Sequence, residues 1–215
     1  PASGYDERVS EGGSCLKMLE DGFHDVPPGK VAMVVTHLEM RERADITDIR
    51  LRDGVLFHKV DADVDWFRDV FMRVGALEWL WFARLEMNEA ELSGILQDPK
   101  VEHYTLQFNG QDEALLELDF RQEGACELSY FGLTPALIGT GSGRYLMNEA
   151  IQRAWSRPIR RFHVHTCTID SPQALSFYQR SGFAPVRQQI EVADDPRITG
   201  LLPRTAAPNV PIFQP

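Results

Sequence analysis

The chain has 215 residues, of which 43% are hydrophobic and 25% are charged, and its formal net charge at pH 7 is -10. This length and composition suit one large α/β domain, alone or with a small appendage. The acidic balance argues against a nucleic-acid partner, because proteins of that class present clustered basic side chains to the phosphates. No apolar run approaches the roughly 18 to 20 residues that a membrane span needs, and the first residues do not read as a secretion signal. We therefore expect no membrane partner and a cytoplasmic location.

The three cysteines are far apart in the sequence, at Cys15, Cys126 and Cys167. An odd number without a C-x-x-C pair indicates neither a disulfide framework nor a zinc ribbon. Reduced thiols are the simplest interpretation, and they agree with a cytoplasmic location.

The two ends of the chain differ from its middle in composition. Residues 1–30 are rich in Gly, Asp, Glu and Ser and predict a partly flexible arm, with one short helix around Cys15–Leu19. Residues 196–215 contain five prolines, which exclude a regular helix and favour an extended tail on the surface or on a partner. The main domain is expected over residues 31–195.

From residue 31 onward the pattern predicts strands, then helix, then strands again. Branched apolar residues favour strands at Val31–Leu38 and Val55–Val60. Residues 62–97 carry aromatic and aliphatic side chains at helical spacing, which form either core or the wall of a substrate cleft. Polar turns then separate three segments that are expected to form consecutive antiparallel strands, at Val101–Phe108, Ala114–Arg121 and Ala125–Leu133.

A glycine-rich loop follows the last of these strands. It runs from Ile138 to Arg144 as Ile-Gly-Thr-Gly-Ser-Gly-Arg, and apolar residues at helical spacing follow it up to Trp155. Glycines let the backbone approach a ligand closely, and the free N–H groups of a first helical turn attract phosphate oxygens. The spacing fits neither the G-x-G-x-x-G dinucleotide fingerprint nor a P-loop. The loop predicts either a cradle for a diphosphate or a helix entry that binds nothing.

A second motif follows a strand that is predicted over Arg160–Thr168. Ser171 is expected to cap a helix, with Pro172 at its first position and Gly182 directly after its end.

Together the two motifs resemble the signatures of the GNAT acetyltransferase family. The second signature, Asn-x-x-Ala-x-x-x-Tyr-x-x-x-Gly-Phe, is matched by Ala174, Tyr178, Gly182 and Phe183, with Ser171 in the Asn position. The first, Gln/Arg-x-x-Gly-x-Gly/Ala, is matched by Gly141 and Gly143, with Ile138 in the Gln/Arg position. Ile138 offers no polar contact, and Ser171 is shorter than Asn. The resemblance covers residues 101–192 well and residues 31–100 only in general layout.

The resemblance implies an α/β fold of the α+β kind, in which helices flank a mixed, mostly antiparallel, twisted sheet. The sheet is expected to splay between the strands at 125–133 and 160–168, where the pantetheine arm of the cosubstrate acetyl-CoA enters. Backbone groups near Phe131 and Leu133 would bind the arm and polarise the thioester carbonyl. The diphosphate would rest on the N–H groups from Gly139 through Ser142 to Arg144, with the Arg144 side chain as an extra counter-charge.

Acetyl transfer from a thioester needs a neutral amine and a proton for the departing thiolate. By resemblance to the family, Glu127 is the expected general base and Tyr178 the expected acid. The competing interpretations are a solvated strand glutamate and a merely packed aromatic ring. Glu117, Asp119 and His165 are the next candidates for the base.

Two further groups of residues are weaker candidates for a functional role. His163 and His165 are expected to share one face of a strand, but no third ligand is indicated, so we expect no metal. Cys126 and Cys167 are typical of small buried thiols rather than acyl carriers. Direct transfer from the thioester is therefore expected.

Two functional classes follow. The first is an acetyl-CoA-dependent N-acetyltransferase that acts on a primary amine of a small molecule or a protein. The second is a catalytically silent acyl-CoA-binding sensor or regulatory module, and fold alone does not separate the two. Both Glu127 and Tyr178 are present, which favours the enzyme. The sequence does not identify the amine acceptor, and it leaves a homodimer open.

Overall fold

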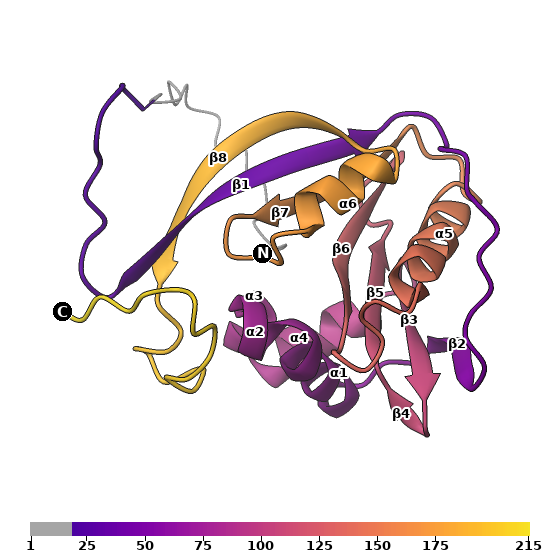
Figure 1. Ribbon diagram of the computed structural model, residues 1–215, viewed down its shortest axis with the longest axis horizontal. Coiled ribbons are helices and arrows are strands. Elements are labelled where there is room, and N and C mark those ends of the chain that lie inside the picture. The colour runs from indigo at the N-terminus through magenta and orange to yellow at the C-terminus, as the bar shows by residue number, and fades with distance from the viewer. Residues whose placement is uncertain (1–18) are drawn as a thin grey trace.

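The computed structural model describes residues 19–215, which form one eight-stranded sheet with helices on both faces (Figure 1). Apart from Leu19, the short helix expected around Cys15–Leu19 lies outside the described residues. The strands are β1 (Lys30–Met40), β2 (Val55–Val60), β3 (Val101–Phe108), β4 (Gln111–Asp112), β5 (Ala114–Asp119), β6 (Ala125–Leu133), β7 (Arg161–Cys167) and β8 (Ala184–Asp194).

The strand order in the sheet is β2-β3-β5-β6-β7-β1-β8, and β4 pairs with the end of β3, at Gln107 and Phe108. Only β6 and β7 pair in parallel, whereas the other neighbours are antiparallel. The expected mixed, mostly antiparallel sheet is therefore confirmed, and β2, β3 and β6 have the predicted bounds. β5 ends two residues early because the Asp119 carboxylate accepts the backbone N–H of Arg121 at 2.8 Å and turns the chain.

The segment 62–97 is helical as expected, but it is broken into short pieces. They are α1 (Val64–Phe71), the π-helix η1 (Met72–Ala76), α2 (Leu77–Trp79), α3 (Ala83–Glu86) and α4 (Glu89–Leu96). Leu80 ends α2 in the left-handed region, with φ of 52°. Asn88 begins α4 through a capping box with Glu91, which satisfies two free N–H groups at the helix start.

The two faces of the sheet carry different helices. On one face, α5 (Ser142–Ala154) and α6 (Ala174–Arg180) bury apolar side chains such as Leu146 and Tyr178 against the strands. The short helices α1 to α4 pack on the other face, where Phe67 and Phe71 meet Tyr130 of β6 (Figure 1). Burying each such side chain contributes about 1.5 to 3 kcal/mol. Among residues 19–215, no helix is long and apolar enough to cross a membrane.

The C-terminal residues 196–215 lack a helix, as expected, but they do not form an extended tail. They fold into turns, and Leu202 packs into the core with α1 to α4. The cause is Arg197, whose buried guanidinium bonds the Asp195 carboxylate at 2.7 Å and the carbonyl oxygens of Ala207 and Val210 at 3.2 and 2.8 Å. A buried charge needs such partners, so the chain wraps around it.

Candidate functional site

The sheet opens between β6 and β7. Their parallel ladder joins Ala125–Glu127 to Arg161–His163 and stops there, so the later residues of the two strands diverge. This is the splay that the sequence predicted. At the same point β6 carries a β-bulge in its pairing with β5, since Leu118 and Glu117 of β5 pair with Leu128 and Tyr130 and leave Ser129 as the extra residue.

A cavity of about 310 Å³ occupies the splay. Most residues predicted to bind the cofactor line it, namely Phe131, Leu133, Gly139, Gly141, Gly143, Arg144, Ser171 and Tyr178. Its other end is aromatic and is formed by Trp79, Trp81 and Tyr130. The two sequence motifs, at residues 138–144 and 171–183, therefore meet around one space.

The glycine loop begins α5 with backbone angles that favour glycine. Gly139 and Gly141 have φ of 77° and 86°, and Gly141 is the N-cap of the helix. A Cβ at either position would meet nothing within 4 Å, so the space above them is open. The first N–H groups of a helix have no intrahelical partner. The Ser142 hydroxyl is turned inward to Thr140 at 2.8 Å, which leaves Ser142 only its backbone N–H for a ligand.

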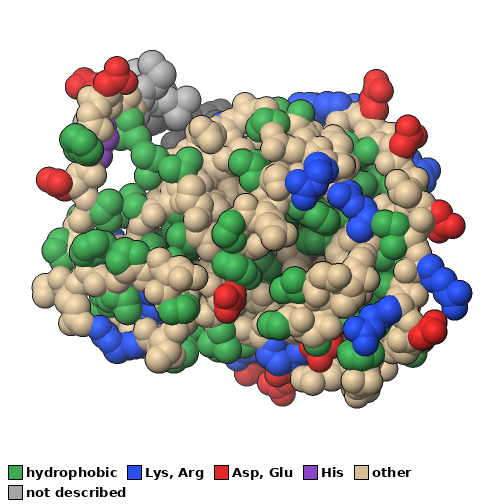
Figure 2. Space-filling model, in the orientation of Figure 1, with side chains coloured by type: hydrophobic (Ala, Val, Ile, Leu, Met, Phe, Trp, Pro, Cys, Tyr) green, Lys and Arg blue, Asp and Glu red, His purple; other side chains and the backbone are tan. Residues whose placement is uncertain are grey.

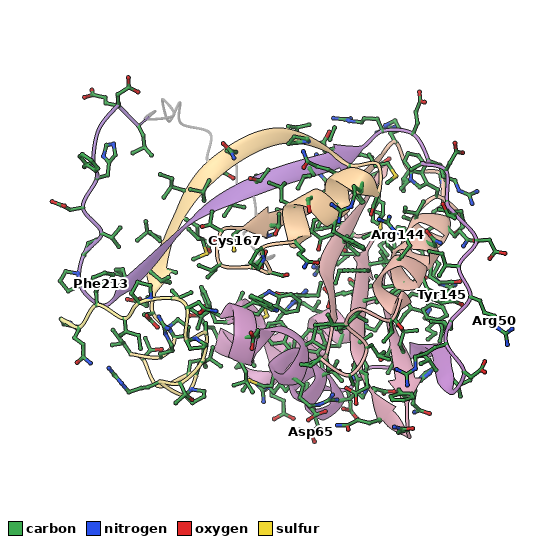
Figure 3. The ribbon with its side chains drawn as sticks, viewed as in Figure 1. Arg50, Asp65, Arg144, Tyr145, Cys167 and Phe213 are labelled. Atoms are coloured by element: carbon green, nitrogen blue, oxygen red, sulfur yellow. The ribbon has the colours of Figure 1, made fainter. Side chains whose placement is uncertain are left out.

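Arg144 supplies positive charge beside this loop. Its guanidinium lies 4.9 Å from the Phe177 ring centroid and donates to Ser181 Oγ at 2.8 Å, between α5 and α6 (Figure 3). Partial burial and the neighbouring Arg180 hold the pKa of Arg144 below its usual range. Basic side chains lie over α5 and α6 on the viewed face, whereas acidic ones lie mostly at its rim (Figure 2). The net negative chain thus carries local positive charge beside the glycine loop.

The helix of the second motif begins later than predicted. Its N-cap is Gln173, which makes no side-chain cap, and Ser171 precedes the helix without capping it. The prediction that Ser171 is the N-cap was wrong, because the Cys167 to Ser171 segment turns around the Asp170 carboxylate instead. The predicted stop is confirmed: Gly182 has φ of 99°, and Phe183 N–H bonds the carbonyl oxygen of Tyr178 in a Schellman arrangement.

Tyr178 lines the cavity from α6. Its ring is buried and stands edge-on to Phe131 and Phe183, with centroids 6.3 and 6.0 Å away. Burial and the nearby Asp170 charge raise the pKa of the Tyr178 phenol above its usual range. The hydroxyl therefore stays protonated at neutral pH and is available as a donor.

Glu127 stands at the point where β6 and β7 part, but it does not line the cavity. Burial and the negative charges of Asp119 and Glu117 raise its pKa to about 7. Its side chain is 26% exposed, and Oε1 lies 3.7 Å from Nδ1 of His165. His165, in contrast, does line the cavity.

The two strand histidines share a face, as predicted, because Phe162 and Val164 point to the opposite core. Burial lowers the pKa of His165 to about 3, helped by the nearby His37. Burial and Arg161 lower the pKa of His163 to about 4. Both rings are neutral at pH 7. No set of three or more His, Cys, Asp or Glu side chains within residues 19–215 could hold a metal ion.

A buried charge network lies next to Glu127, and the sequence did not reveal it. Arg84 of α3 donates to Glu117 Oε1 at 2.6 Å, and His103 Nε2 lies 3.0 Å from Oε2. The Arg84 and Glu117 side chains are at most 1% exposed. Burial opposes the charge on Glu117, but Arg84 and His103 outweigh it and keep its pKa below the usual range. The only available signal was that His103 and Glu117 lie at paired positions of two predicted strands.

A splayed sheet, an open glycine-rich helix start and a cavity between them are the features that the resemblance to the GNAT family implied. A sequence model described as the acetyltransferase (GNAT) family matches residues 73–183, more than half of the chain. The chain therefore belongs to the GNAT acetyltransferase family, for which acetyl-CoA is the cosubstrate. A comparison with curated proteins gave no match.

Solved structures with the same fold are distant in sequence. A GCN5-related N-acetyltransferase from Sphaerobacter thermophilus has a TM-score of 0.58 and 10% identity, over 88% of this chain and 55% of its own. A tandem GNAT protein from the clavulanic acid biosynthesis pathway has a TM-score of 0.54 and 13% identity, over 80% and 55%. A conserved protein of unknown function from Staphylococcus epidermidis has a TM-score of 0.50 and 16% identity, over 78% and 63%. The chain thus spans less than two thirds of each of these proteins.

Proposed function

We propose that the protein transfers the acetyl group of acetyl-CoA directly to a primary amine, through its main domain of residues 31–195. The observation that carries this proposal is that both family motifs, the β6–β7 splay and a neutral buried tyrosine line one cavity.

The cofactor would be held mainly by backbone groups. The diphosphate rests on the N–H groups from Gly139 to Arg144, and the pantetheine arm lies along β6 at Phe131 and Leu133. Ile138 is 59% exposed and adds no polar contact, so the cradle depends on the backbone and on Arg144. Ser171 faces the same cavity and is close enough in the fold to contact the arm.

The amine must lose a proton as it attacks the thioester carbonyl. Glu127, with a pKa of about 7, is the proposed acceptor of that proton. His165 would mediate, since its Nδ1 lies 3.7 Å from Glu127 Oε1 and the residue lines the cavity. The neutral imidazole takes the proton from the amine at Nε2 and gives its own Nδ1 proton to the carboxylate. The C–N bond forms as the C–S bond breaks.

The departing thiolate needs a proton as well. Tyr178 is the proposed donor, because its phenol remains protonated and lies in the cavity. After product release, the tyrosine regains a proton from solvent, Glu127 returns its proton to Nδ1 of His165, and Nε2 releases one to solvent, which restores the starting tautomer.

A screen of primary amines with acetyl-CoA, read out as thiol release, tests the proposal. We expect release that depends on one acceptor class and disappears in Gly141→Val, since valine cannot easily adopt φ of 86° at the cradle. Gly110→Val is the matched control, because Gly110 has φ of 78°, equally open surroundings and a place in the β3–β4 turn. Binding of acetyl-CoA without any transfer would favour the alternative, a silent acyl-CoA sensor.

A further inference from the structure

The indole of Trp81 bridges the two sides of the splay. It follows α2 and lies against Tyr130 of β6, with ring centroids 5.4 Å apart. Its Nε1 donates at 3.0 Å to Oδ1 of Asp170, which follows β7. Both Trp81 and Asp170 line the cavity. One side chain thus reaches from β6 to the end of β7, across the opening where the ladder between the two strands is missing.

The surroundings of this indole are shaped to hold it. A Cβ on Gly75 of η1 would lie 2.0 Å from the Trp81 ring, and a Cβ on Gly132 of β6 would lie 3.2 Å from it. The Phe71 ring packs on a further side, with centroids 5.6 Å apart. Leu80, directly before Trp81, is buried with φ of 52°, a conformation that costs energy for a residue with a side chain. Trp81 itself is 7% exposed.

The far end of the bridge is fixed as well. Oδ2 of Asp170 accepts the Thr166 hydroxyl at 2.7 Å and the Cys167 N–H at 2.9 Å. Oδ1 is then directed at the indole. Hydrogen bonds to an ionised carboxylate are roughly twice as strong as neutral ones. The bridge is therefore a fixed wall rather than a mobile side chain.

We propose that Trp81 sets the size of the acyl group that the cavity accepts, by closing the splay on the side of α1 to α4. This inference rests on the proposed function, because it takes the thioester to lie in the splay. An acetyl methyl group ends against the indole. Each further methylene has to displace a ring that Asp170 and the close glycine contacts hold in place. Val74 closes the adjoining space, since its Cγ1 lies 2.4 Å from where a Cβ on Gly132 would be.

The test compares the affinities of CoA, acetyl-CoA, butyryl-CoA and hexanoyl-CoA by titration calorimetry. The parent should bind butyryl-CoA at least about 10-fold more weakly than acetyl-CoA, in line with the discrimination of a hydrophobic pocket against added methylenes. Trp81→Ala should reduce that ratio to about 3-fold or less. Trp66→Ala is the matched control: the indole of Trp66, in α1, also donates to a carboxylate, that of Asp112 at 2.8 Å, but it does not line the cavity, so this variant should keep the parent ratio. Trp81→Phe keeps an aromatic ring at this position, so its affinity ratio should fall between those of the parent and Trp81→Ala.

CoA without an acyl group reports on the fold and on the cofactor site separately. A parent that does not bind CoA would overturn the proposed function and this inference with it. A parent that binds CoA but shows no preference for acetyl-CoA would overturn the inference alone. The inference alone would also be overturned if the Trp81 variants that still bind CoA keep the affinity ratio of the parent. If Trp81→Ala loses CoA binding through misfolding, Trp81→Phe decides the question.

Discussion

At the scale of single residues, the chemistry of the site depends on one carboxyl group in an unfavourable place. Glu127 is half buried beside Asp119 and Glu117, both negatively charged, and its pKa rises to about 7. Glu117 and Glu127 lie in opposite environments: Arg84 and His103 outweigh the burial of Glu117, whereas at Glu127 burial and the two carboxylates outweigh Arg84 and Arg121. A base tuned near the working pH is efficient in proton transfer. The cost is a less stable native state.

Glu127→Gln tests both the catalytic role of Glu127 and its cost to the stability of the fold. We expect kcat/KM for the amine to fall by about 10² to 10⁴, in line with general-base contributions. The folded state holds the Glu127 proton up to about pH 7, whereas an unfolded glutamate loses it near 4.5, so the group destabilises the fold progressively as pH rises between these values. The variant should therefore be more stable than the parent at pH 8, by roughly 1 to 3 kcal/mol, and equal to it at pH 4. Urea unfolding at the two pH values measures this.

Glu123→Gln, in the exposed turn between β5 and β6, is the control and should change neither quantity. The activity of the parent should rise with pH through about 7, because Glu127 must be ionised to accept a proton. An active Glu127→Gln with no gain in stability would remove Glu127 from both roles.

At the scale of elements, glycines decide where the helices around the site begin and end. Gly182 ends α6 with φ of 99°, and a Cβ there would lie 2.6 Å from Cβ of Ala44. Gly182→Ala should lower the free energy of unfolding by about 2 to 3 kcal/mol, since left-handed strain and overpacking act together. Gly94→Ala offers the opposite case, because Gly94 lies within α4 with open space around it. It should raise the free energy of unfolding by about 0.5 to 1 kcal/mol. Equal effects of the two changes in chemical denaturation would contradict this account.

Elements with strong local signals were predictable from the sequence. Alternation and polar turns gave the bounds of β3 and β6, and glycine gave the end of α6. The start of α6 was not predictable from the helix motif, since the Asp170 carboxylate organises the preceding turn through Thr166, four residues earlier, and is itself bonded by Trp81, which lies 89 residues earlier in the chain. The breaks in the segment 62–97 also depend on tertiary contacts, because Gly75 and Leu80 adapt the helix to the packing of the Trp81 ring.

At the scale of the whole molecule, the arrangement depends on contacts between distant segments. β1, near the start of the chain, lies between β7 and β8 and pairs with both. No local pattern predicts such a neighbour, and β8 itself lies at the sheet edge with mostly exposed side chains, so it lacks the buried alternation that marks an internal strand. This placement brings the ring centroids of His37, in β1, and His165 to 5.6 Å from each other. The sequence could name the glycine-loop, β6 and α6 residues of the cavity, but not Trp81 and Asp170, the charge network or the neighbouring strands.

The most direct test of the central claim is a structure of the protein with CoA bound. The account predicts that the diphosphate oxygens lie within hydrogen-bonding distance of the N–H groups between Gly139 and Arg144, and that the pantetheine arm runs between β6 and β7 with its sulfur near the Tyr178 hydroxyl. A coenzyme bound elsewhere on the molecule, or a splay that stays empty at saturating CoA, would contradict it.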